Sequence, residues 1–156
     1  GKKPVRQVKK LGADRSYQFA VPLEAGLVTY TVEFGSITGG QEKILHTVTD
    51  IVCGDAYVFD GQSNTVATDW GKENYEFTSP WVRSFGSAST NPNDARTELW
   101  GSASGRGTGG KLEIGLWGME LGRRLVENHK VPICIINGAV GGTRIDQHQR
   151  DPADPE

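Results

Sequence analysis

The chain has 156 residues, 17 of them basic and 19 acidic, so its formal net charge is -2. Charges of both signs are mixed along the chain, which excludes the strongly basic face typical of nucleic-acid-binding proteins. No stretch reaches the roughly 18 to 20 apolar residues of a membrane span, and no apolar segment follows the first lysines as a signal peptide requires. We therefore expect no nucleic-acid or membrane partner and a neutral or small polar substrate.

The first third of the chain predicts antiparallel strands. Apolar and aromatic residues alternate with polar ones over residues 17–21, 28–34 and 44–51, a pattern typical of half-buried strands. Glycine-containing turn signals, above all the Gly35-Ser36 and Gly39-Gly40 pairs, separate these runs. The pattern predicts an antiparallel β-sandwich-like module over residues 1–52, with a structural role.

The pattern then changes to that of a parallel α/β sheet. Residues 56–59 are apolar without alternation, which predicts a strand buried on both faces. Residues 64–110 predict a long loop anchored by aromatic side chains, 111–130 an amphipathic helix, and 133–136 a second buried strand. This order is a right-handed βαβ unit with parallel strands, so the loops that follow the two strands open on the same edge of the sheet.

Two glycine-containing loops are therefore expected to meet at that edge. Gly61-Gln62-Ser63-Asn64 follows the first strand, and Gly141-Gly142-Thr143 follows the second. A serine hydroxyl becomes a good nucleophile when a base takes its proton, and the tetrahedral intermediate needs donors aimed at its oxyanion. The backbone N–H groups of Ser63 and of the glycine pair are candidate donors, because glycine reaches φ angles that other residues avoid.

These residues resemble a known group of hydrolases. Gly54-Asp55, a strand, Gly61-Gln62-Ser63-Asn64 and then residues 136–145 with the Gly-Gly-Thr-Arg turn are similar, in order and spacing, to the sialate O-acetylesterase and acetylxylan esterase group of the SGNH (GDSL-type) hydrolase superfamily. The resemblance covers residues 54–146, which match the N-terminal portion of the catalytic domain. It implies that residues 53–156 are the first βαβ part of a three-layer α/β/α domain with a parallel sheet.

The resemblance also implies a role for each matching residue. Ser63 would be the catalytic nucleophile and lend its N–H to the oxyanion hole, with Gly142, or Gly141 in its place, as another donor. The substrate-binding residues would be Gln62, Asn64, Thr143 and Arg144. The implied reaction is hydrolysis of O-acetyl esters on carbohydrates, of sialate or xylan type, without metal or cofactor. The resemblance favours a secreted or periplasmic enzyme, although no residue pattern defines the compartment.

Two motifs of that group have no counterpart here: a His-Gln-Gly-Glu block with a further oxyanion donor, and a late Asp-x-x-His pair with the base. Asp146-Gln147-His148 is one residue too short and follows the glycine turn directly, so we predict an ordinary surface-loop histidine at His148. His46 and His129 are predicted to be structural. The catalytic Asp and His are therefore expected on a downstream fragment or second chain, without which this piece should be poorly active and expose apolar sheet surface.

Two other functions remain open. A non-catalytic carbohydrate-binding or scaffold protein would bind glycan through the aromatic residues of the 64–110 segment, with Ser63 as a turn residue. The missing histidine motif favours this alternative. An esterase that acts on a non-sugar acyl ester also fits, because fold-level analogy does not choose the alcohol.

Overall fold

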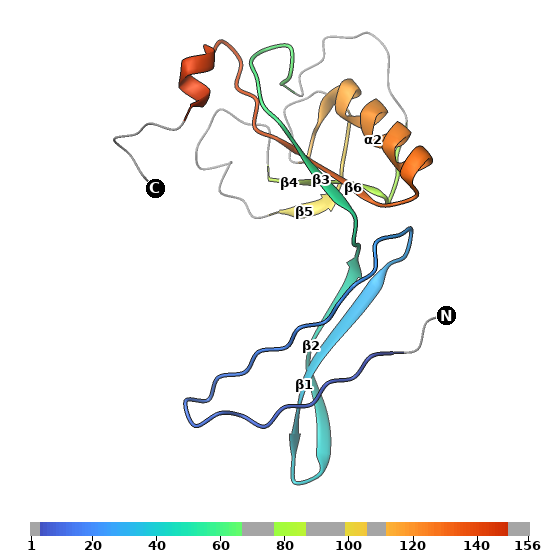
Figure 1. Cartoon of the computed structure of the whole chain (residues 1–156), viewed down its shortest axis with the longest axis vertical. Coiled ribbons are helices and arrows are strands. Elements are labelled where there is room, and N and C mark those ends of the chain that lie inside the picture. Colours follow the sequence, from blue (N-terminus) through green and yellow to red (C-terminus); the bar gives the residue numbers. More distant parts are fainter. Residues whose placement is uncertain (1–3, 67–76, 87–98, 106–111, 150–156) are drawn as a thin grey trace.

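A computed structural model describes residues 4–66, 77–86, 99–105 and 112–149. This part of the chain is mixed α/β, with a two-stranded antiparallel sheet and a separate four-stranded mixed sheet (Figure 1). Within the described ranges, no helix is long and apolar enough to cross a membrane. The elements are β1 (Tyr30–Thr38), β2 (Gln41–Ile51), β3 (Asp55–Phe59), β4 (Val82–Phe85), β5 (Trp100–Ser102), α2 (Gly115–His129), β6 (Ile133–Asn137) and the 3-10 helix η1 (Ile145–His148).

β1 and β2 form a long antiparallel hairpin, which confirms strands in the 28–34 and 44–51 runs. Gly39 and Gly40 connect them with φ of +60° and +79°, the left-handed values that both central residues of a type I′ turn need. Gly35 instead lies inside β1, next to a register shift. A Cβ atom at Gly35 would come 2.5 Å from the Lys43 backbone oxygen, so the two strands approach this closely only with glycine.

The predicted strand over residues 17–21 is wrong. In Figure 1 this segment runs beside the hairpin as an extended, irregular stretch. The Tyr17 ring stacks on Phe34 of β1 with a centroid separation of 5.0 Å, and Gln7 Nε2, in the preceding N-terminal stretch, donates to the Ala20 oxygen at 2.7 Å. The described part of residues 1–52 thus contains one two-stranded sheet, and not the two stacked sheets of a sandwich.

The second sheet has the strand order β3-β6-β4-β5. β3 and β4 both pair in parallel with β6, whereas β5 is antiparallel to β4. The parallel β3–β6 pair confirms the predicted relation of these strands, with Asp55 opposite Ile133 and Phe59 opposite Asn137. The prediction of one loop over residues 64–110 is wrong, because β4 and β5 lie within it.

Helix α2 packs against one face of this sheet and forms the core with it. Val82 of β4 faces the helix, since a Cβ atom at Gly122 would lie 2.7 Å from Val82 Cγ1. Gly122 therefore lets the helix backbone approach the sheet closely. The buried apolar cluster consists of Val82, Ala103, Ile114, Met119, Val126, Ile133 and Ile135, with Phe59, Phe77, Trp81, Leu125 and Val131 packed against it.

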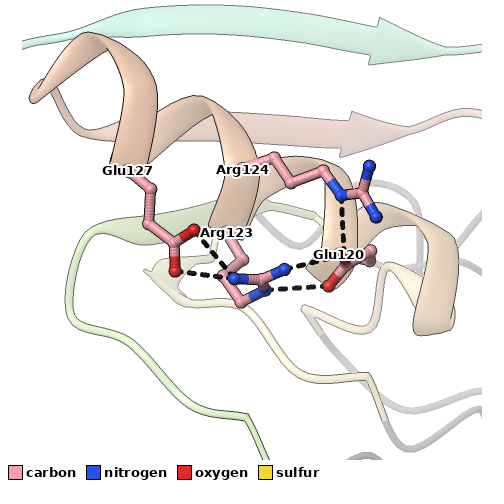
Figure 2. A network of polar contacts seen from close by, with 4 residues as sticks. All are labelled: Glu120, Arg123, Arg124 and Glu127. Atoms are coloured by element: carbon pink, nitrogen blue, oxygen red, sulfur yellow. Dashed lines mark hydrogen bonds and ion pairs between the residues drawn. The ribbon is translucent and has the colours of Figure 1, made fainter.

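The outer face of α2 carries an ion-pair network (Figure 2). Arg123 bonds to Glu120 on one side and to Glu127 on the other, and Arg124 Nε donates to Glu120 at 2.7 Å. The hydrogen bonds from Glu120 and Glu127 raise the pKa of Arg123. The helix ends where Lys130, with φ of +58°, donates its N–H to the Val126 oxygen at 3.0 Å. The predicted helix is confirmed, but it begins at Gly115 rather than near residue 111.

β3 is an edge strand, so the prediction of a strand buried on both faces is wrong. Within the described ranges it pairs with β6 alone, and Val58 is 69 % exposed. Strand alternation places Val58 on the face opposite α2, beside its register partner Ile136. Val58 therefore leaves an apolar side chain exposed on that face of the sheet.

Arg83 links the four-stranded sheet to the hairpin. Both terminal nitrogens of its buried side chain donate at 2.8 Å to the carboxylate of Asp50, near the end of β2. Asp50 adopts a left-handed backbone with φ of +60°, a conformation that Asp tolerates better than most residues. The two parallel hydrogen bonds form a bidentate ion pair, which fixes the orientation of the Arg83 guanidinium relative to the Asp50 carboxylate.

We expect Asp50→Asn to reduce the acid sensitivity of folding. The hydrogen bond from Arg83 lowers the pKa of Asp50. A carboxylate whose folded pKa is depressed stabilises the fold above its unfolded pKa, and this contribution is lost as pH falls through the folded pKa. The variant should therefore unfold at lower urea concentration at neutral pH, and its midpoint should fall less on acidification. Glu33→Gln, on exposed β1, is the matched control. The prediction is contradicted if the urea midpoint of Asp50→Asn falls on acidification as much as that of the wild-type chain.

Candidate functional site

The loops that follow β3 and β6 meet at one edge of the sheet. Val140 donates its N–H to the Gly61 oxygen at 3.0 Å. Asn137, at the end of β6, donates from Nδ2 to the Thr65 oxygen at 3.2 Å. One loop carries Ser63 and the other carries the glycine pair, so the parallel topology brings together the segments that the sequence predicted to be neighbours.

Ser63 lies at the exposed tip of a tight turn. Thr65 donates its N–H to the Gln62 oxygen at 2.8 Å, which leaves Ser63 and Asn64 as the central residues. The Ser63 hydroxyl donates to Gln62 Oε1 at 2.6 Å. Among the described residues, no backbone oxygen accepts the N–H of Ser63. The side chain of Gln62 thus fixes the position of the Ser63 hydroxyl.

The glycine turn distinguishes its two glycines. Gly142 has φ of +76°, in the left-handed region that favours glycine. Gly141 has no such angle, and a Cβ atom there would meet Val66 Cγ2 at 3.9 Å, an ordinary contact with the Ser63 loop. The requirement for glycine therefore falls on Gly142, and its role as an oxyanion donor stays a prediction.

We expect Gly142→Ala to slow any reaction at Ser63 more than Gly141→Ala does. Alanine in the left-handed region costs about 1–2 kcal/mol, which should shift the turn and its N–H groups, whereas Gly141 has room for a methyl group. The measurement is the rate of Ser63 labelling by a fluorophosphonate probe, with the urea midpoint of each variant as the stability control. Equal rates in the two variants would remove the distinction between these glycines.

The structure pairs two residues that sequence reasoning left apart. His148 Nδ1 lies 2.5 Å from Asp60 Oδ1, across 88 positions of sequence. The His148 side chain is 8 % exposed, so the prediction of an ordinary surface-loop histidine is wrong. The signal that identifies the pair is topological: Asp60 directly follows β3 and His148 lies shortly after the turn that follows β6, so both fall at the same sheet edge.

Thr143 and Arg144 have different surroundings. Thr143 Oγ1 lies 2.5 Å from the Val140 oxygen and 2.6 Å from His148 Nε2, inside the loop cluster. Arg144 points outward and bonds to Asp146. This hydrogen bond raises the pKa of Arg144 and lowers that of Asp146. Arg144 therefore lies at the surface, whereas the Thr143 hydroxyl is engaged inside the loop cluster.

A small pocket lies next to the Ser63 turn. Its volume is about 30 Å³, and its lining is Phe59, Asn64, Thr65, Val66, Ile114 and Trp117. This space holds one or two water molecules, and a sugar needs about ten times more. A carbohydrate at Ser63 would therefore bind on the open surface of the loops rather than in this pocket. Over the described ranges, no three His, Cys, Asp or Glu side chains gather to hold a metal ion.

No protein-family model matches the chain, and a comparison with curated proteins finds no match. The candidate site thus stands on its own geometry. That geometry combines an exposed serine hydroxyl, a left-handed glycine turn and an Asp–His pair at one sheet edge.

Proposed function

We propose that the chain is the nucleophile-bearing part of an SGNH-type esterase that removes O-acetyl groups from carbohydrates. The observation that supports this most directly is the hydrogen bond from the Val140 N–H to the Gly61 oxygen. It joins the loop of Ser63 to the turn of Gly141 and Gly142. A nucleophile and oxyanion donors need this kind of fixed relation, because preorganised donors stabilise charge without rearranging during the reaction.

In the proposed reaction, the Ser63 oxygen adds to the acetyl carbonyl carbon and its proton passes to a base. The negative charge that develops on the carbonyl oxygen is stabilised by the N–H groups of Ser63 and Gly142. The bond from the carbonyl carbon to the sugar oxygen then breaks, and the sugar leaves as an alcohol with the proton from the base. Water releases acetate from the acetyl-enzyme by the same steps. Before it attacks, the Ser63 hydroxyl must release Gln62 Oε1.

The base is proposed to come from a partner segment, a downstream fragment or a second chain, that carries the catalytic Asp and His. Two contacts support this. The Ser63 hydroxyl bonds to Gln62, and the His148 ring has both nitrogens engaged by Asp60 and Thr143. The exposed Val58 on the face opposite α2 also fits a domain in which further helices complete a three-layer α/β/α arrangement.

The substrate-binding surface is proposed to consist of Gln62, Asn64 and Arg144, with Thr143, whose hydroxyl is engaged by Val140 and His148, supporting the glycine turn from inside. Asn64 is exposed within the Ser63 turn and Arg144 is exposed after the glycine turn, and we propose that the hydroxyl and ring oxygens of a sugar approach there. Labelling of Ser63 by a fluorophosphonate tests the nucleophile. Acetate release from acetylated xylan, acetylated sialic acid and a simple aryl acetate then separates sugar esterases from general ones. Equal rates on all three would remove the carbohydrate part of the proposal.

One observation favours the carbohydrate-binding alternative. Trp117 is 73 % exposed on α2, and Trp100 is 62 % exposed while its ring packs on Phe85 at 4.5 Å. Exposed aromatic faces are suitable for stacking against sugar rings. A glycan-array signal that Trp100→Ala or Trp117→Ala removes, without any labelling at Ser63, would support this function over the esterase.

A further inference from the structure

Asp60, His148 and Thr143 form a continuous chain of contacts between the two loops. Asp60 follows β3, Thr143 lies in the glycine turn after β6, and His148 ends η1. His148 Nδ1 meets Asp60 Oδ1 at 2.5 Å, and His148 Nε2 meets Thr143 Oγ1 at 2.6 Å. The imidazole ring therefore bridges the end of one parallel strand to the loop of the other.

Counting protons assigns a charge state to this bridge. The Thr143 hydroxyl has a single hydrogen but lies within 2.6 Å of two partners, the Val140 oxygen and His148 Nε2. The carbonyl oxygen can only accept, so the hydroxyl hydrogen belongs to that contact. Thr143 must then accept a hydrogen from Nε2, while Nδ1 donates to the Asp60 carboxylate. The three contacts are satisfied together only when both ring nitrogens carry hydrogen, which is the positively charged imidazolium.

The surrounding charges agree with that state. On the 3-10 helix, Arg144 and Asp146 bond to each other, so among the described residues Asp60 is the charged group in contact with the His148 ring. The ring is 8 % exposed and the Asp60 side chain 52 % exposed. The pair is therefore only partly screened by solvent, and its hydrogen bonds retain the added strength of charge-assisted contacts.

We propose that charged His148, held by Asp60, is a positioning residue that clamps the Gly141-Gly142-Thr143 turn against the Ser63 loop. The clamp acts through the Thr143 hydroxyl, which in turn ties the turn to Val140, the residue that donates to Gly61. In this role His148 takes no proton from Ser63. Removal of the His148 ring leaves the Thr143 hydroxyl without this contact, so the clamp loosens. Its effect on catalysis rests on the proposed function, whereas the clamp itself does not.

Hydrogen exchange of the Val140 amide measures the clamp without any enzyme activity. In His148→Ala and in Thr143→Val, the Val140 amide should exchange about tenfold faster than in the wild-type chain, the size expected when a hydrogen bond to a charged group is lost. Thr143→Ser keeps the hydroxyl and should restore slow exchange. His46→Ala, exposed on β2, is the matched control and should leave the Val140 amide unchanged.

The contrast between Thr143→Ser and Thr143→Val adds a readout that a purely structural role does not move. Valine keeps the shape of the side chain and serine keeps the hydroxyl, so only Thr143→Ser should retain wild-type protection of Val140. Unchanged Val140 protection in His148→Ala overturns the clamp, and so does a loss of Ser63 labelling with protection intact, because that would make His148 the base. If Ser63 is never labelled yet Val140 responds as expected, the esterase proposal fails and the clamp stands.

Discussion

Ser63→Ala should abolish reaction of this chain with a fluorophosphonate probe. In the wild-type reaction the Ser63 oxygen attacks phosphorus, fluoride leaves and a phosphonyl adduct remains on the protein. The substitution removes the attacking atom, so the rate should fall about 10³-fold or more, as when a nucleophile is lost from a serine hydrolase. Intact mass before and after the probe gives the measurement, with peptide mapping to assign the adduct.

The control for this experiment is Ser36→Ala, an exposed serine on β1 that should label at the wild-type rate. The assay is made with the chain and any polypeptide that purifies with it, because the proposed base lies on a partner segment. Labelling that persists in Ser63→Ala would contradict the assignment of the nucleophile. Absence of labelling in every variant, including the wild-type chain with its partner, would favour the carbohydrate-binding alternative.

Gly54→Ala should prevent the four-stranded sheet from forming normally. A Cβ atom at Gly54 would lie 1.9 Å from the Pro132 oxygen, which also accepts the Asp55 N–H at 3.0 Å. The Pro132 oxygen and the Asp55 N–H are backbone groups at the start of the β3–β6 pairing. Neither can move aside as a flexible side chain could. We expect a loss of about 4 kcal/mol or more in the free energy of unfolding, at the exceptional end for single substitutions.

Urea unfolding followed by circular dichroism measures this effect. Because small domains are stable by about 5–15 kcal/mol, Gly54→Ala should be largely unfolded or have a far lower midpoint. Gly138→Ala is the matched control after β6, since a Cβ atom there would have its nearest contact, the Phe59 oxygen, at 3.5 Å. Similar midpoints for both variants would contradict the close approach at Gly54.

The sequence predicted correctly those elements that are specified by their own residue types, such as glycine pairs and apolar runs. The Gly39-Gly40 pair predicted the hairpin connection, because a two-residue turn of this type needs left-handed angles at both positions. The apolar runs on either side of α2 predicted the parallel β3–β6 pair, because a strand, a helix and a second strand form a right-handed crossover. The turn is decided by two adjacent residues, whereas the strand pair follows from the order of the elements along the chain.

Elements that depend on distant partners were missed. β4 contains Arg83 and Ser84, both buried, so its sequence lacks the apolar run that predicts a central strand. Arg83 is accepted there because Asp50, 33 positions away, neutralises it. Residues 17–21 alternate like a strand, yet they pack through Tyr17 on Phe34 without joining the ladder. Alternation of apolar and polar residues indicates that one face of a segment is packed against the protein. It does not show whether the backbone of that segment is hydrogen-bonded in a sheet.

The sequence by itself determined which loops form the candidate site, because parallel strands send their carboxyl ends to one edge and each loop carries its glycines and Ser63 in order. Only the tertiary structure decided which side chains bond across that edge. The contact between Asp60 and His148 spans 88 positions, and the left-handed angle that separates Gly142 from Gly141 depends on how the turn packs. Hydrogen bonds between side chains require distances set to within a few tenths of an ångström, and spacing along a chain does not contain that information.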